Sequence, residues 1–129
     1  MYSLNKFRNS TYSLVVYQND KRIFTSQASA LKPLLFFLRK KISNNNLIIY
    51  DKIIGRAAAL LLTLVKPQKI YTPTLSYSAK KVLQQHKIAV EFKKQVQFIS
   101  DYTKEKMCGW EKLAKDKTPQ QFYKILNNK

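Results

Sequence analysis

The sequence has only one cysteine, Cys108, and one histidine, His86, in 129 residues. An internal disulfide is therefore excluded, and this sparing use of cysteine suits a reducing compartment such as the cytoplasm. Structural and catalytic zinc sites take three or four thiolate, imidazole or carboxylate ligands. A zinc site built from cysteine and histidine is excluded by the same count.

Long apolar runs are also missing. The longest one covers 57–62, and two more apolar residues, Leu64 and Val65, follow Thr63. A membrane-spanning helix needs about 20 apolar residues. The first ten residues lack the basic start and apolar stretch of a signal peptide. We therefore expect a cytoplasmic protein that has no membrane segment.

Acidic residues are few, with 7 Asp and Glu against 24 Lys and Arg, which gives a formal net charge of +17. A field of this strength attracts polyanions, so a basic nucleic-acid-binding module is one interpretation. The other interpretation is compositional drift. The lysines are scattered, arginine is scarce although it is the usual reader of bases, and an AT-rich genome encodes such a composition.

The length and a hydrophobic fraction of 45% predict one packed domain over residues 1–129. Residues 12–17 and 22–26 are rich in β-branched and aromatic side chains, and the turn pair Asn19-Asp20 lies between them. This pattern predicts a β-hairpin. A helix is predicted over 31–41, with Pro33 in its first turn.

Predicted strands and helices alternate after this point. The strands are 47–50, 69–72 and 88–92, and the helices lie within 51–65, 76–86 and 108–115 and from Thr118-Pro119 onward. Alternation of this kind indicates parallel pairing with right-handed crossovers. Together with the hairpin, it predicts a three-layer α/β/α sandwich around a mixed sheet of four to five strands.

Three segments carry a resemblance to a known family: SQASALKPLL, LIIYDKIIGRAAALLL and MCGWEKL. Their order and spacing resemble a family of uncharacterised bacterial proteins with a cytidine-deaminase-like fold. The resemblance runs from about Ser13 to Ala114, and DKIIGRAAALL is its most specific part. It implies a single deaminase-like domain, and such folds commonly assemble into homo-oligomers.

The sequence departs from zinc deaminases of this fold in both of their motifs. The His/Cys-x-Glu motif falls near 29–32, and the Pro-Cys-x-x-Cys motif falls on 52–56. The first segment has no histidine, cysteine or acidic residue, and Ile53 and Arg56 stand where the second has its cysteines. We therefore expect no zinc, no other cofactor and no zinc-dependent deaminase activity.

The pocket of that fold can persist without its metal. Open α/β sheets bind ligands beyond the carboxyl ends of their strands, where Asp51, Lys52, Gly55 and Arg56 follow the strand LIIY. Helix N-termini there favour anions, and Lys32 lies at the neighbouring helix start. These residues predict a site for a small anionic, nucleotide-like ligand. In the alternative interpretation, Asp51 only caps the helix and pairs with Lys52 or Arg56.

Cys108 and Glu111 resemble a Cys-x-x-Glu pair of the family. On a helix they would share one face, and neighbouring lysines would lower the pKa of the thiol. This suggests a cysteine-dependent enzyme that uses Cys108 with Asp51 and Lys52. The alternative is a packed cysteine, with Glu111 in a solvent-exposed ion pair.

Overall fold

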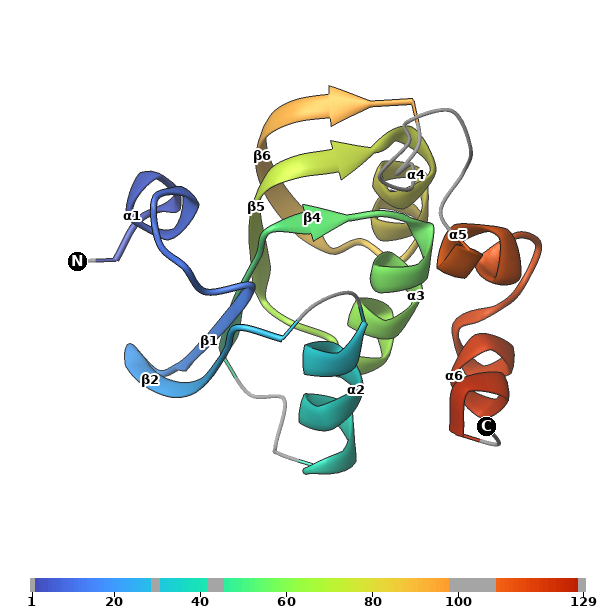
Figure 1. Ribbon diagram of the computed structural model, residues 1–129, viewed down its shortest axis with the longest axis horizontal. Coiled ribbons are helices and arrows are strands. Elements are labelled where there is room, and N and C mark those ends of the chain that lie inside the picture. The colour runs from blue at the N-terminus through green and yellow to red at the C-terminus, as the bar shows by residue number, and fades with distance from the viewer. Residues whose placement is uncertain (1, 29–30, 42–45, 98–108, 128–129) are drawn as a thin grey trace.

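A six-stranded mixed sheet organises the computed structural model, which describes residues 2–28, 31–41, 46–97 and 109–127 (Figure 1). The strands are β1 (Leu14–Gln18), β2 (Lys21–Ser26), β3 (Leu47–Asp51), β4 (Ile53–Ile54), β5 (Lys69–Ser76) and β6 (Ala89–Val96). Strand β1 pairs antiparallel with β2 and β3, whereas β3, β4 and β6 all pair parallel with β5. The mixed sheet predicted from the sequence is confirmed.

The β1–β2 hairpin turns at Asn19 and Asp20, as predicted. Both residues have positive φ angles, 51° and 66°, and Gln18 pairs with Lys21 across them. Two-residue hairpin loops need positive φ, which asparagine and aspartate tolerate better than most residues. Local chemistry thus fixes this end of the sheet.

The sixth strand was not predicted. Strand β3 pairs with β5 as far as Tyr71, and the two-residue strand β4 takes over from Thr74. Lys52 separates β3 from β4, and Pro73 lies at the same level in β5, which continues past the predicted end at Thr72. Proline donates no hydrogen bond to a sheet, so it is tolerated where β5 changes partner.

Three helices cover one face of the sheet: α2 (Lys32–Arg39), α3 (Arg56–Val65) and α4 (Tyr77–Gln85). Their buried side chains share one core with Leu14, Ile49 and Ile70 of the sheet. Helix α3 lies between the other two, and every residue from Ala57 to Thr63 is buried. Its apolar side chains point all round the helix, a pattern that favours burial on every side.

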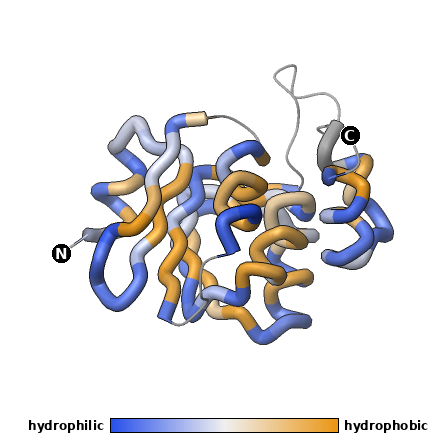
Figure 2. The backbone as a smooth tube through the Cα atoms, turned by 90° about the horizontal axis from the view of Figure 1, so that it is seen from below, coloured by the Kyte–Doolittle hydropathy of each residue, from blue (hydrophilic) through white to orange (hydrophobic). Residues whose placement is uncertain are grey.

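Two short helices, α5 (Gly109–Ala114) and α6 (Pro119–Asn127), form an outer layer against α3 (Figure 1). Phe122 and Leu126 join the main core from there. Figure 2 shows the apolar segments in orange gathered between the sheet and these helices. None of the helices in the described ranges has the length and apolar character needed to cross a bilayer.

The opposite face of the sheet carries α1 (Leu4–Arg8), which was not predicted. Leu4 and Phe7 pack there with Val15 and Tyr50 in a second, smaller core. Successive residues of a strand point to opposite faces, so Val15 and Tyr50 face α1 while their neighbours face α3. The order of layers is therefore α1, sheet, α2–α4 and α5–α6.

Candidate functional site

Asp51 ends β3 at the carboxyl edge of the parallel strands. It pairs with Leu14 and follows Leu47 and Ile49 on the helix-covered face. The backbone N–H groups of Lys52 and Ile53 donate hydrogen bonds to its carboxylate. These bonds favour the charged form, but the desolvation of the carboxyl outweighs them and raises its pKa to about 7.

Within the described residues, no cation forms a salt bridge with Asp51, and its carboxylate accepts hydrogen bonds from the backbone alone. The N-cap of α3 is Gly55, so Asp51 does not cap that helix either. The interpretation of Asp51 as a helix cap paired with Lys52 or Arg56 is therefore wrong. Asp51 as a whole is half-buried, and a carboxyl whose pKa is raised by burial at the end of a strand is a candidate functional group.

Lys52 turns away from the helix layer toward the N-terminal segment. Its Nζ donates hydrogen bonds to the carbonyls of Ser10 (2.7 Å) and Tyr12 (2.8 Å). The ammonium also lies 4.7 Å from the centre of the Phe7 ring, a cation–π contact. Burial lowers the pKa of Lys52. The Lys52 ammonium thus connects the end of β3 to α1 and the segment that follows it. A role of Lys52 in ligand binding remains a prediction.

Gly55 and Arg56 begin α3. Gly55 is buried and extended, with φ −97° and ψ −176°. The Arg56 guanidinium donates from Nε to the carbonyl of Ala114 and from Nη2 to that of Lys117, both at 3.1 Å. Lys52 and Arg56 therefore reach toward opposite faces of the sheet, and the structure does not bring their charged groups together beside Asp51.

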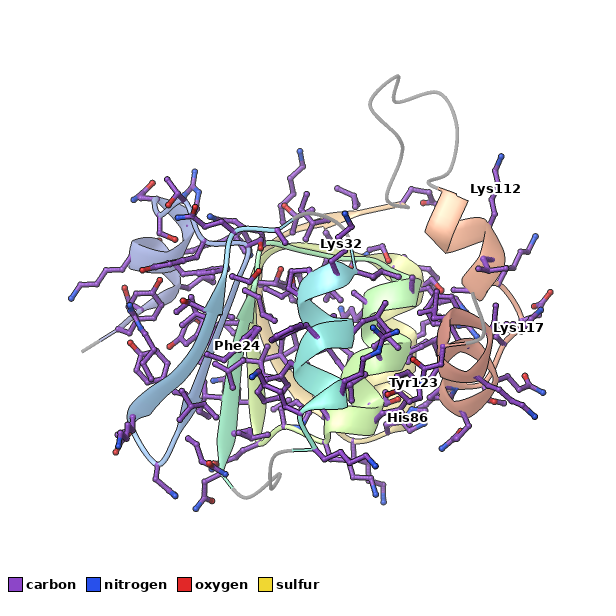
Figure 3. The ribbon with its side chains drawn as sticks, turned by 60° about the horizontal axis from the view of Figure 1, so that its bottom comes forward. Phe24, Lys32, His86, Lys112, Lys117 and Tyr123 are labelled. Atoms are coloured by element: carbon purple, nitrogen blue, oxygen red, sulfur yellow. The ribbon has the colours of Figure 1, made fainter. Side chains whose placement is uncertain are left out.

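Arg56 also lines a groove of about 420 Å³ between α3, α4 and the α5–α6 connection. His86 and Lys117 line the same groove, and Figure 3 shows both on the side where α6 packs. His86 is the C-cap of α4, whereas Arg56 is the first residue of α3. Arg56 and His86 line the same groove because α4 runs alongside α3. The linear sequence does not reveal this packing.

Lys32 is the first residue of α2 and is exposed. It lines a hollow of about 290 Å³ together with Phe24 and Phe36, whose rings stack at 5.9 Å. Figure 3 shows Lys32 at the end of α2 that lies near the carboxyl edge of the sheet. Ser26, the last residue of β2, shares this hollow and pairs with Leu14, which in turn pairs with Asp51.

Cys108 lies outside the described residues, and so does the side chain of Glu111, although Glu111 belongs to α5. A catalytic role for Cys108 with Asp51 and Lys52 therefore remains a prediction. Over the described ranges, no three histidine, cysteine, aspartate or glutamate side chains cluster as metal ligands would.

Comparisons with known proteins place the whole chain in one family. The sequence model of a domain of unknown function, DUF1893, matches residues 3–129. The crystal structure of a DUF1893 family protein from Thermotoga maritima superimposes with a TM-score of 0.85 at 27% sequence identity. The similarity covers 97% of this chain and 85% of that one. No curated protein matches the chain significantly.

Proposed function

Because the chain belongs to the DUF1893 family, whose function is unknown, we propose its role from its own residues. The protein is a single cytoplasmic, cytidine-deaminase-like domain that lacks zinc and binds a small anionic, nucleotide-like ligand. The ligand lies at the carboxyl edge of the parallel strands, beside Asp51.

The sheet supports the deaminase-like assignment. A hairpin precedes the parallel strands, β1 alone runs antiparallel to its neighbours, and α2 and α3 follow β2 and β3. In zinc deaminases, as the sequence resemblance implies, these two helix starts bring the metal ligands together. Here Lys32 begins α2, and Gly55 and Arg56 stand at the start of α3. The chemistry at this edge therefore differs from that of the zinc enzymes.

The position of the Asp51 carboxyl at the end of β3, where burial raises its pKa, is the observation that carries the proposal. With a pKa of about 7, this carboxyl populates both protonation states near neutral pH. Its protonated form can donate a hydrogen bond and its ionised form can accept one, as recognition of the amide or amino edge of a nucleobase requires. The same group could transfer a proton at neutral pH.

Positive charge supplies the preference for an anionic ligand. Lys32 lies at the same edge of the sheet, because β2 and β3 are both antiparallel to β1 and end in register with it. The net charge of +17 attracts anions to the whole molecule. A phosphate near Lys32 and a base near Asp51 would use both features.

Isothermal titration of the intact protein against nucleosides and their mono-, di- and triphosphates tests the proposal. We expect one phosphorylated compound to bind, and Asp51→Asn and Lys32→Ala each to weaken it about tenfold. Lys40→Ala removes an equal charge from the other end of α2 and serves as the matched control. If no compound binds, or if both variants bind like the wild type, the proposal is wrong.

A further inference from the structure

The face of the sheet that carries α1 presents tyrosines from three adjacent strands. Tyr17 comes from β1, Tyr50 from β3 and Tyr71 from β5. Tyr50 and Tyr71 are paired in register, and their rings stack with centroids 4.8 Å apart and planes 12° apart. Tyr2, from the segment before α1, meets the Tyr50 ring edge-on at 4.9 Å.

These four tyrosines line the largest described hollow, of about 650 Å³, together with Ile48 and Asp20. Tyr17 and Tyr71 remain partly exposed, whereas Tyr50 is buried beneath them. The hydroxyl of Tyr2 is buried, and no atom of the described residues forms a hydrogen bond with it. Buried hydroxyls usually have a partner, so the Tyr2 hydroxyl is an unsatisfied polar group on a residue that lines the hollow.

Cations flank the hollow on both sides. The guanidinium carbon of Arg22 lies 4.9 Å from the centre of the Tyr2 ring and 5.5 Å from that of Tyr17. On the other side, the ammonium of Lys69 lies 4.8 Å from the centre of the Tyr71 ring. One row across four strands contains Arg22, Tyr17, Ile48 and Lys69. The backbones of Arg22 and Lys69, at the two ends of this row, are therefore about 14 Å apart.

The acidic residues of this face do not cancel its charge. Asp20 lines the hollow, and Glu91 lies 3.7 Å from the Lys69 ammonium. Helix α1, which packs on the same face, adds the exposed side chains of Lys6 and Arg8. The surface therefore combines aromatic rings that lie open in part with an excess of cations.

We propose that this tyrosine face binds single-stranded nucleic acid. Open sheets that carry aromatic side chains on adjacent strands bind unpaired bases by stacking, and neighbouring cations hold the phosphates. The backbone separation of about 14 Å between Arg22 and Lys69 is close to the spacing of phosphates about two nucleotides apart, with bases on the tyrosines between them. This site lies on the opposite face of the sheet from Asp51 and does not depend on the proposed nucleotide site.

Two other occupants fit less well. A second copy of the chain would bring two net charges of +17 together, and their repulsion opposes association. A quaternary ammonium would be repelled by the positive charges of Arg22 and Lys69, which already lie over the rings.

Fluorescence anisotropy with labelled ten-nucleotide oligothymidine and oligouridine tests the proposal, and a duplex of the same length provides the reference. We expect both single strands to bind more tightly than the duplex and to weaken as salt rises from 50 to 200 mM. Tighter binding of oligothymidine would indicate a preference for DNA, and tighter binding of oligouridine a preference for RNA. Weak binding to every oligonucleotide at low salt, or tighter binding to the duplex, would overturn the proposal.

Variants locate the surface. Tyr71→Ala should weaken binding of the single strands about tenfold, whereas Tyr71→Phe, which keeps the ring, should bind like the wild type. Arg22→Ala should also weaken binding about tenfold, and more than Lys112→Ala, which removes the same charge from α5 on the far side of the molecule (Figure 3). Equal losses in Arg22→Ala and Lys112→Ala would show non-specific attraction and contradict the site.

Arg22→Ala and Lys112→Ala change exposed side chains, so this comparison holds even if Tyr71→Ala fails to fold. The proposal is also overturned if an acidic protein displaces oligothymidine and the Tyr71→Ala variant binds both of them with wild-type affinity. That result would identify a surface that binds acidic proteins.

Discussion

The guanidinium of Arg56, the first residue of α3, donates a hydrogen bond to the carbonyl of Ala114, the last residue of α5. A second bond reaches the carbonyl of Lys117 in the connection to α6. The two bonds add a charged donor to backbone carbonyls at and after the end of α5, where the carbonyl of Ala114 also accepts a hydrogen bond from the backbone N–H of Lys117. Arg56 therefore joins the buried helix of the core to the outer layer.

Replacing Arg56 with glutamine should loosen that outer layer. We expect faster hydrogen exchange over residues 109–127 and a free energy of unfolding lower by about 1–3 kcal/mol, because two carbonyls lose a charged donor. Arg8→Gln, an exposed change on α1, is the matched control. Unchanged exchange over 109–127 in Arg56→Gln would show that the two bonds do not hold the layer.

Replacing Lys52 with methionine should destabilise the opposite side of the sheet. The apolar stem is retained, but the carbonyls of Ser10 and Tyr12 lose their donor and Phe7 loses its cation. We expect the free energy of unfolding in urea to fall by about 1–3 kcal/mol. Lys124→Met, an exposed change on α6, should have little effect, and an equal effect of both variants would contradict this role of Lys52.

Asp51 should make the protein less stable as pH rises. Its pKa is about 7 in the folded state against an ordinary value of 3.8, so the unfolded chain binds fewer protons between these values. Stability therefore falls by up to about 1.4 kcal/mol per pH unit between pH 4 and 7 and then levels off.

Asp51→Asn removes this dependence while keeping an acceptor for the two backbone N–H groups. Urea unfolding at pH 4.5, 6 and 7.5 should show the variant gaining on the wild type as pH rises. Asp116→Asn changes an exposed aspartate with a positive φ, which asparagine tolerates, and it serves as the matched control. If the free energy of unfolding changes with pH equally in Asp51→Asn and in the wild type, the raised pKa of Asp51 is refuted.

Zinc should not bind as a resident metal. After incubation with zinc and dialysis, elemental analysis should find well below one ion per chain, because one cysteine and one histidine cannot supply a ligand set. We also expect a chelator to leave the melting temperature unchanged. One tightly held zinc ion per chain, whose removal lowers the melting temperature, would contradict the interpretation that the zinc-binding motifs are absent.

Features governed by neighbouring residues could be predicted from the sequence. Asn19 and Asp20 tolerate the positive φ that their turn requires, and Thr118 begins α6 by exchanging hydrogen bonds with Gln121. Helix α1 has only five residues, too few for a periodic apolar pattern. Its one signal is Ser3, which accepts a hydrogen bond from the backbone of Lys6.

Features governed by distant partners could not be predicted. Arg56 and Ala114 are 58 residues apart, and Lys52 bonds to carbonyls about 40 residues before it. The sequence placed both cations at the right junction, but long side chains can turn to either face of a sheet. The desolvation of Asp51 likewise depends on packing from several elements, so only its position at the end of a strand was foreseeable.

The central claim is that Asp51 lies in a ligand site at the carboxyl edge of the sheet. Titration calorimetry of the wild type and Asp51→Asn with the tightest-binding nucleotide, at pH 6 and pH 8, tests it most directly. We predict that the wild-type affinity changes between these pH values and that the affinity of Asp51→Asn does not. An affinity that is identical in both proteins at both pH values would contradict the account.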